Sequence, residues 1–269
     1  GESILPLYCA STMVDFFKNK IDKKEIKGDV LIIPSINHYA LNIGKRFWPL
    51  DNTDINMMFP GYELGETTQR IAKKVFDAIS GYDFGIILER RPDPATCLPY
   101  IKLFKSGYED LIGAKKFGFK MIHHRTMKSI DTVTLQYNWQ LWGTKAFSIM
   151  CPSDNQVDKK IASQINQAMI RFMDKTKIID YHIFNGYEST VIDRDSIEVI
   201  KSLKSGIFIG KELPGNYVSK DQVIGEIVHS LEGDVIHQFL APCNGMVTCF
   251  YSNSLIYEHA VAFRIAKIG

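Results

Sequence analysis

The sequence predicts an α/β domain with a mixed sheet flanked by helices, followed by a small all-β module. Apolar segments of strand length alternate with amphipathic helical segments along most of the chain, as expected for a sheet covered by helices. After about residue 196 the helical period disappears, and short strands alternate with Gly and Pro. The 269 residues accommodate one large and one small domain. We therefore expect domains at residues 1–195 and 196–269.

Hydrophobic periodicity predicts the elements of the first domain. Apolar side chains at helical spacing indicate helices at residues 5–20, 67–79, 107–117 and 158–173. Short, continuous apolar runs are typical of strands that are buried on both faces. Such runs occur at residues 29–34, 84–88, 120–123 and 146–150.

Composition and charge exclude several classes of protein. The 32 basic and 30 acidic side chains give a net charge of +2, so no nucleic-acid-binding surface is indicated. No apolar run reaches about 18 residues, so we expect no membrane-spanning helix. The five cysteines are scattered and odd in number, which favours free thiols in a reducing cytoplasm. A single redox pair, such as Cys243 with Cys249, remains an alternative.

Several motifs follow one another in an order known from one enzyme family. They are Ile-Pro-Ser-Ile-Asn at 33–37, Gly-Lys-Arg at 44–46, Pro-Leu-Asp-Asn-Thr-Asp-Ile-Asn at 49–56, Phe-Pro-Gly at 59–61, Thr-Thr-Gln-Arg-Ile-Ala at 67–72, Asp-Phe-Gly-Ile-Ile-Leu-Glu at 83–89 and Ala-Pro-Cys-Asn-Gly at 241–245. This series resembles the succinylglutamate desuccinylase/aspartoacylase family of zinc-dependent deacylases. The resemblance implies a zinc-carboxypeptidase-like domain with a biotinyl-carrier-like module after it, and hydrolysis of the amide bond of N-acyl amino acids.

The resemblance also implies that the family's zinc chemistry is degraded here. Catalytic zinc needs three protein ligands and an open position for water. Carried onto this sequence, two ligand positions fall on Ser3 and Glu89, a third falls before residue 1, and the general-base position falls on Met150. Serine is a poor zinc ligand, one carboxylate cannot hold the metal alone, and methionine cannot accept a proton. We expect this sequence to begin inside the natural domain, so that a residue before Gly1 would supply the third ligand position.

Other polar positions of the family persist or are relocated. Arg46, Asp54 and Asn56 match its substrate-binding motif and are expected to bind a small anionic N-acyl amino acid or a related molecule. His38 stands where the family has the Pro of an Asn-Pro turn, and with Glu89 it offers a relocated metal site or a plain hydrogen-bonding group. The arginines either converge on an anion or belong to a solvated loop; they are Arg46, Arg90, Arg91 and Arg125.

Two hypotheses from different classes remain open. The first is a desuccinylase/aspartoacylase-like hydrolase that uses zinc in an altered site. The second is a non-catalytic pseudoenzyme, without a cofactor, that binds a small anionic ligand or a protein partner. The aromatic residues 137–142 line a pocket, form a homo-oligomer contact or pack in the core.

Overall fold

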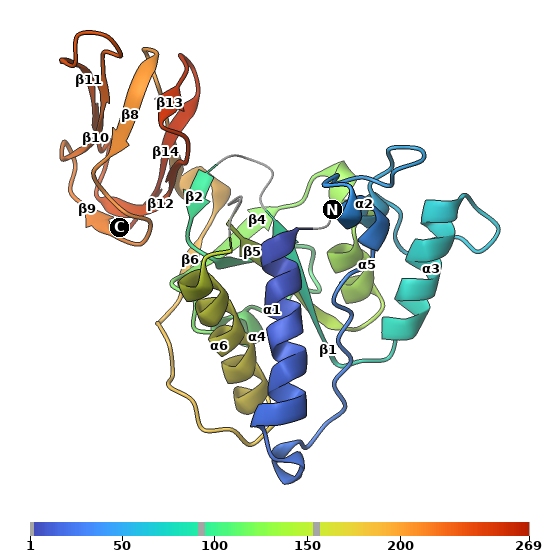
Figure 1. Ribbon diagram of the computed structural model, residues 1–269. Helices are drawn as coiled ribbons and strands as arrows, with labels where there is room; N and C mark the ends of the chain where they lie inside the picture. The colour runs from blue at the N-terminus through green and yellow to red at the C-terminus, as the bar shows by residue number, and fades with distance from the viewer. Residues whose placement is uncertain (1–2, 91–94, 153–156, 269) are drawn as a thin grey trace. The chain divides into compact units, whose positions relative to one another are not determined.

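The computed structural model describes residues 3–90, 95–152 and 157–268, which form two compact units (Figure 1). Residues 3–90, 99–150 and 157–191 belong to the first unit. Residues 95–98, 151–152 and 192–268 belong to the second. The segment 95–98 thus belongs to the same unit as strands that lie about a hundred residues or more later in the sequence. No helix in these ranges is both long and apolar enough to cross a membrane.

A mixed sheet of five strands confirms the predicted α/β class. Its strands are β1 (Phe84–Arg90), β3 (Tyr100–Lys105), β4 (Met121–Thr126), β5 (Lys145–Cys151) and β6 (Thr190–Ile192). Their spatial order is β1-β5-β3-β4-β6, with β3 parallel to β4 and antiparallel to β5. The strands predicted at 84–88, 120–123 and 146–150 are therefore confirmed.

The helices also agree with most of the predicted pattern. They are α1 (Ile4–Asp15), α2 (His38–Asn42), α3 (Thr67–Ile79), α4 (Leu111–Lys115), α5 (Leu135–Leu141) and α6 (Lys159–Lys175), with shorter turns at Phe16–Lys20, Lys23–Glu25, Ile55–Met57, Ser129–Val133 and Arg194–Ser196. The helix predicted at 107–117 is reduced to α4. Its first residues form a turn instead, because the Glu109 carboxylate accepts the backbone N–H groups of Ser106 and Gly107 at 3.0 and 2.7 Å.

The two faces of the sheet have different characters. Phe172 of α6 packs against Phe84 of β1 and Phe147 of β5, which makes that face aromatic and apolar. On the opposite face Trp139 of α5 packs on Gly85, where a Cβ atom would lie 2.4 Å from the indole ring. Successive strand residues point to opposite faces. The α5 face therefore also receives the side chain of Glu89.

The strand predicted at residues 29–34 is not formed. This segment has no regular secondary structure, and Val30, Leu31 and Ile33 are 38, 46 and 38% exposed. A strand needs a hydrogen-bonding partner as well as apolar side chains. Within the described residues no strand pairs with this segment. The apolar run was therefore insufficient evidence for a strand.

Antiparallel strands make up the second unit. They are β2 (Ala95–Cys97), β7 (Ile197–Lys201), β8 (Gly206–Gly210), β9 (Tyr217–Val218), β10 (Val223–Val228), β11 (Val235–Leu240), β12 (Gly245–Tyr251), β13 (Leu255–Ile256) and β14 (Val261–Lys267). One sheet has the order β11-β10-β8-β13, and the other has the order β2-β12-β14-β7 with β9 also paired to β12. Their core includes the buried rings of Phe208, Phe239 and Phe263.

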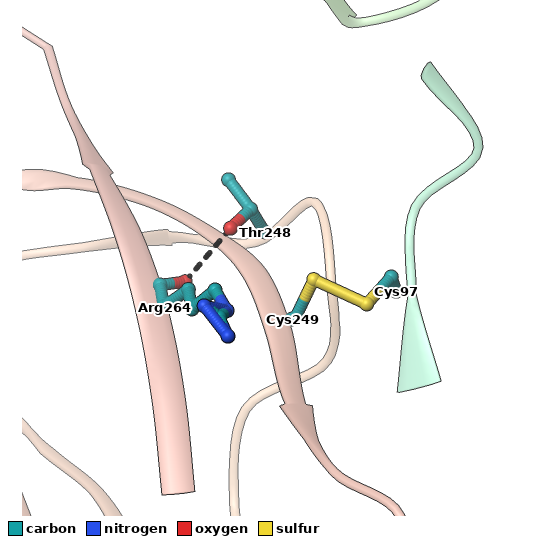
Figure 2. Close-up of a disulfide and its surroundings, with 4 residues drawn as sticks. All are labelled: Cys97, Thr248, Cys249 and Arg264. Atoms are coloured by element: carbon teal, nitrogen blue, oxygen red, sulfur yellow. Dashed lines mark hydrogen bonds between the residues drawn. A yellow bond between two sulfur atoms is a disulfide. The ribbon is translucent and has the colours of Figure 1, made fainter. Parts of the chain in front are cut away.

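A disulfide corrects the expectation of free thiols. Cys97 and Cys249 are bonded to each other (Figure 2). Cys9, Cys151 and Cys243 form no disulfide. The alternative pair of Cys243 with Cys249 is therefore also wrong. The bond depends on the pairing of β2 with β12, which places residues 152 positions apart directly opposite each other. Spacing between cysteines in the sequence does not reveal that pairing.

Candidate functional site

A buried polar network lies on the α5 face of the first sheet. Lys102 Nζ of β3 is 2.6 Å from Glu89 Oε2 of β1, and the Ser148 hydroxyl of β5 is 2.6 Å from Glu89 Oε1. Lys102 and Ser148 are direct partners in the β3–β5 register, so their side chains share one face. β5 lies between β1 and β3. The Lys102 side chain therefore passes over the small Ser148 side chain to reach Glu89.

Gln136 connects this network to α5. Its side chain is 1% exposed, its Nε2 donates to the backbone carbonyl of Lys102 at 2.9 Å, and its Oε1 lies 2.9 Å from Ser148 Oγ. A serine hydroxyl has one proton to donate. Ser148 therefore donates to either Glu89 or Gln136 at one time, and its proton can move between the two acceptors.

The Glu89 carboxylate is held in its ionised form. Burial, the largest single influence, raises its pKa, but the Lys102 charge and the hydrogen bonds from Lys102 and Ser148 together hold the pKa of Glu89 below its ordinary value. Only 21% of the Glu89 side chain and 15% of the Lys102 side chain are exposed. The pair is therefore shielded from much of the solvent screening that weakens surface ion pairs.

A second ion pair continues the network. Arg125 of β4 binds Asp131 through two parallel contacts, at 2.9 and 2.7 Å. Burial raises the pKa of Asp131, but hydrogen bonds from Arg125 and from the Lys128 backbone, with the charge of Lys102, lower it overall. Both Lys102 Nζ and the Arg125 guanidinium lie over the Phe104 ring, at 5.2 and 4.6 Å from its centre. Two carboxylates and two cationic side chains are thus gathered on one face of the sheet.

The structure brings together the three residues predicted to bind substrate. Arg46 Nη2 is 3.0 Å from Asp54 Oδ2, and Asp54 Oδ1 accepts the backbone N–H of Asn56 at 3.0 Å. The Asn56 side chain in turn accepts the N–H of Leu135, the first residue of α5, at 3.3 Å. The next residue of α5 is Gln136. Helix α5 therefore contacts both the substrate-binding group (Arg46, Asp54 and Asn56) and the polar network around Glu89.

The other predicted site residues are dispersed. Met150 is 7% exposed and lies on β5 two residues after Ser148, and therefore on the same face. Ser3 precedes α1, where its carbonyl accepts the N–H of Leu7. His38 begins α2 and its ring lies 4.2 Å from that of Tyr39. Arg91 is outside the described residues.

Among the described residues, the donors around Glu89 do not fit a zinc ion. Both of its carboxylate oxygens already have a partner, and a catalytic site requires three protein ligands. Among residues 3–90, 95–152 and 157–268, the only three His, Cys, Asp or Glu residues whose ligand atoms lie within 4.8 Å of one another are His229, Glu232 and Asp234 of the second unit. Neither Glu89 nor His38 belongs to that group.

Three residues of the network were not predicted from the sequence, namely Lys102, Ser148 and Gln136. Residues 100–104 alternate between the two faces of β3, which was a usable signal for a strand with a polar position at Lys102. Ser148 is the single polar residue within the apolar run 146–150. That the three side chains meet depends on the strand order and on the position of α5, which short-range patterns do not contain.

Comparison with known proteins gives three results. Residues 8–88 match the model of the succinylglutamate desuccinylase/aspartoacylase catalytic domain. An N-alpha-acetyl-L-2,4-diaminobutyric acid deacetylase of Halomonas elongata is 31% identical over 65 residues, which is 24% of this chain and 19% of that protein. The sequence match thus spans about a fifth of the length of that curated relative.

Solved structures share the fold at low sequence identity. A succinylglutamate desuccinylase/aspartoacylase of Rhodobacter sphaeroides superimposes with a TM-score of 0.73 and 14% identity, over 98% of this chain and 83% of that one. An aspartoacylase family protein of Mesorhizobium loti gives a TM-score of 0.70 and 16% identity, over 100% and 83%. The resemblance recognised from the sequence motifs is therefore confirmed: residues 8–88 match the catalytic-domain model of the succinylglutamate desuccinylase/aspartoacylase family, and the chain shares the fold of solved structures of that name.

Proposed function

We propose that the first unit binds a small anionic N-acyl amino acid, or a related molecule, without zinc-dependent hydrolysis. The contact between Lys102 and Glu89 carries this proposal. Glu89 stands where the family has a zinc-binding histidine. The ammonium group of Lys102 places a fixed positive charge beside it, so this position is electrostatically neutral without a metal ion.

The proton acceptors of the site also argue against hydrolysis. Met150, at the position of the family's general base, cannot take a proton. Glu89 is a weak base because its pKa lies below its ordinary value. The Ser148 hydroxyl that contacts Glu89 is therefore not activated for attack on an amide. The residues that remain can orient a polar ligand but supply neither of the two catalytic groups.

Arg46 is the proposed contact for a ligand carboxylate. Its side chain is 46% exposed, and the contact with Asp54 engages one of its terminal nitrogens. A planar guanidinium can receive a carboxylate through two parallel hydrogen bonds. Asp54, only 11% exposed, fixes the direction of the Arg46 side chain. This geometry supports recognition of an anion that approaches from solvent.

Hydrolysis of an N-acyl amide is the second candidate. It is favoured by the 31% identity over 65 residues to a protein named as an N-acetyl-diaminobutyrate deacetylase. It requires zinc and a proton acceptor, and a metal site that includes Glu89 and His38 would have to displace Lys102 from the carboxylate.

One experiment separates the two candidates. The natural full-length protein is equilibrated with zinc, dialysed and analysed for metal by mass spectrometry. Binding of N-acetyl-L-aspartate and of N-succinyl-L-glutamate is measured by calorimetry, and release of the free amino acid is followed by chromatography. We expect binding without bound metal and without product. One zinc per chain together with product release would establish the hydrolase instead.

The remaining expectations concern the whole protein. We propose a biotinyl-carrier-like fold for the second unit, a cytoplasmic location and a capacity to form homo-oligomers. Light scattering of the purified protein tests the last of these, since a monomer at micromolar concentration would exclude it.

A further inference from the structure

The connection between Glu89 and Lys102 passes through a strand of the second unit. β1 ends at Arg90, one residue after Glu89, and β3 begins at Tyr100, two residues before Lys102. Between them, β2 pairs with β12 of the second unit and not with the sheet that contains β1 and β3. Whatever holds β2 in place therefore holds residues 95–97 of the connection between these two residues.

Within the described residues, few noncovalent contacts hold β2. It has three residues, paired as Ala95 with Tyr251, Thr96 with Phe250 and Cys97 with Cys249. One further backbone bond runs from Leu98 N–H to the Thr248 carbonyl, at 3.2 Å. Among the residues that the structure describes, the apolar cluster at this point consists of Ala95, Cys97 and Cys249. An edge strand this short, with so small an apolar contact, is expected to open easily on its own.

The disulfide is the strongest attachment of β2, and the shape of β12 directs Cys249 toward it. The pairing of β12 with β14 has a bulge between Val247 and Cys249. The extra residue, Thr248, donates its hydroxyl to the Arg264 carbonyl of β14 at 3.0 Å (Figure 2). A bulge changes the direction of the side chains that follow it. Figure 2 shows Cys249 extending from β12 to Cys97 on the adjacent strand.

Access for a reductant comes from a cavity beside the bond. Cys97 and Cys249 are 2 and 3% exposed, so bulky reagents do not reach them directly. A cavity of about 190 Å³ is lined by Ala95 of β2, Cys249 of β12 and Phe263 of β14, among others. This volume admits a small dithiol to the Cys249 side of the bond.

We propose that the Cys97–Cys249 disulfide is a redox-controlled clamp on β2, which lies in the chain between Glu89 and Lys102. A thiolate of a small dithiol attacks Cys249 Sγ, the bond to Cys97 Sγ breaks, and a mixed disulfide forms. The second thiol of the reductant then displaces Cys249. The reductant leaves as a cyclic disulfide, having supplied two electrons, and both cysteines end as thiols with one proton each. Within the described part of the chain, only the few hydrogen bonds and the small apolar cluster then hold β2, which becomes free to separate from β12.

This inference does not depend on the proposed ligand, because its test follows the backbone. Protein purified without reductant is treated with N-ethylmaleimide in denaturant, before and after incubation with dithiothreitol, and labelled thiols are counted by mass spectrometry. Three labels are expected before reduction and five after it. Hydrogen exchange is then measured on both forms. Amides of residues 96–98 should exchange at least about tenfold faster after reduction, whereas those of β14 keep their rates.

Two variants provide the comparison. The double variant Cys97→Ser/Cys249→Ser should exchange at 96–98 like the reduced protein, with or without dithiothreitol. Cys243→Ser, which leaves the bond intact, should respond to dithiothreitol like the wild type. Five labels without reduction would overturn the proposal, and so would unchanged exchange at 96–98. Loss of protection throughout β14 would also overturn it, because the bond would then be a general structural staple. The wild-type comparison decides these points even where the double variant fails to fold.

Discussion

Lys102 and Glu89 form an ion pair of 2.6 Å although the strands that carry them are not neighbours in the sheet. Adjacent strands are separated by about 4.8 Å, so the two backbones lie roughly two such spacings apart. The long Lys102 side chain spans this gap across Ser148 of the intervening strand. A lysine at this position in β3 and a small residue in β5 are thus parts of a single arrangement.

Replacing Lys102 with methionine should destabilise the fold. The substitution leaves the largely buried Glu89 carboxylate without its counter-charge, so its pKa rises and folding must accommodate an unpaired acid. Because both side chains retain some exposure, we expect a loss of about 1–3 kcal/mol, below the value for a fully buried pair. Urea unfolding measures this loss in the free energy of unfolding.

The control is Lys73→Met, which breaks the exposed pair with Asp77 on α3 and should cost less than about 1 kcal/mol. Equal losses in the two variants would contradict this account.

The Glu89 ion pair should also appear in the pH dependence of stability. A carboxylate whose folded pKa is lowered stabilises the fold above its unfolded pKa, about 4.3, and loses that contribution as the pH falls through the folded value. The free energy of unfolding should therefore fall more steeply between about pH 5 and pH 3 in the wild type than in Glu89→Gln. Denaturation across this range provides the measurement, with Glu63→Gln in an exposed turn as the control. Parallel acid limbs for wild type and Glu89→Gln would show that Glu89 is not held ionised.

Ser148 should tolerate a smaller side chain but not a larger one. In Ser148→Ala the path of Lys102 stays open and only hydrogen bonds to Glu89 and Gln136 are lost, for a cost of about 1 kcal/mol. In Ser148→Leu the added carbons occupy the space that Lys102 crosses, and overpacking combined with a broken ion pair should cost about 3 kcal/mol or more. Urea unfolding of both variants, and of both in a Lys102→Met background, distinguishes the contributions. If Lys102→Met does not reduce the cost of the leucine, Lys102 does not pass over Ser148.

Sequence patterns predicted the helix and the side-chain contacts that depend only on residues close together in the chain. Helix α3 has the predicted bounds, because its apolar stripe is regular and Gln69 accepts the N–H of Glu66 at its first turn. Arg46, Asp54 and Asn56 meet because all three lie within eleven residues, and Asp54 is hydrogen-bonded to both of the others. These contacts depend on short-range geometry, which a motif specifies.

Pairing between distant strands explains the failures. The apolar run at 29–34 is not a strand, because strand formation depends on a partner elsewhere in the chain. The ion pair of Lys102 and the bond of Cys97 both result from strand order, which places β5 between β1 and β3 and places β2 beside β12. No periodicity within a window of ten or fifteen residues encodes that order. For this reason the motif residues were found, whereas the residues that neutralise Glu89 were not.

Arg46 provides the most direct test of ligand binding. If its guanidinium receives the ligand carboxylate, Arg46→Met should weaken binding of N-acetyl-L-aspartate at least tenfold, or about 1.4 kcal/mol. Arg46→Lys should give an intermediate affinity, because an ammonium group cannot form two parallel hydrogen bonds in one plane. Stability should change by less than about 1 kcal/mol, since the pair with Asp54 is half exposed on the arginine side. Calorimetry measures the affinity, and urea unfolding measures the stability.

The control is Arg70→Met, at an exposed position of α3, which should bind like the wild type. Identical affinities in Arg46→Met and Arg70→Met would remove Arg46 from the binding site, and a parallel loss of stability would assign it a structural role.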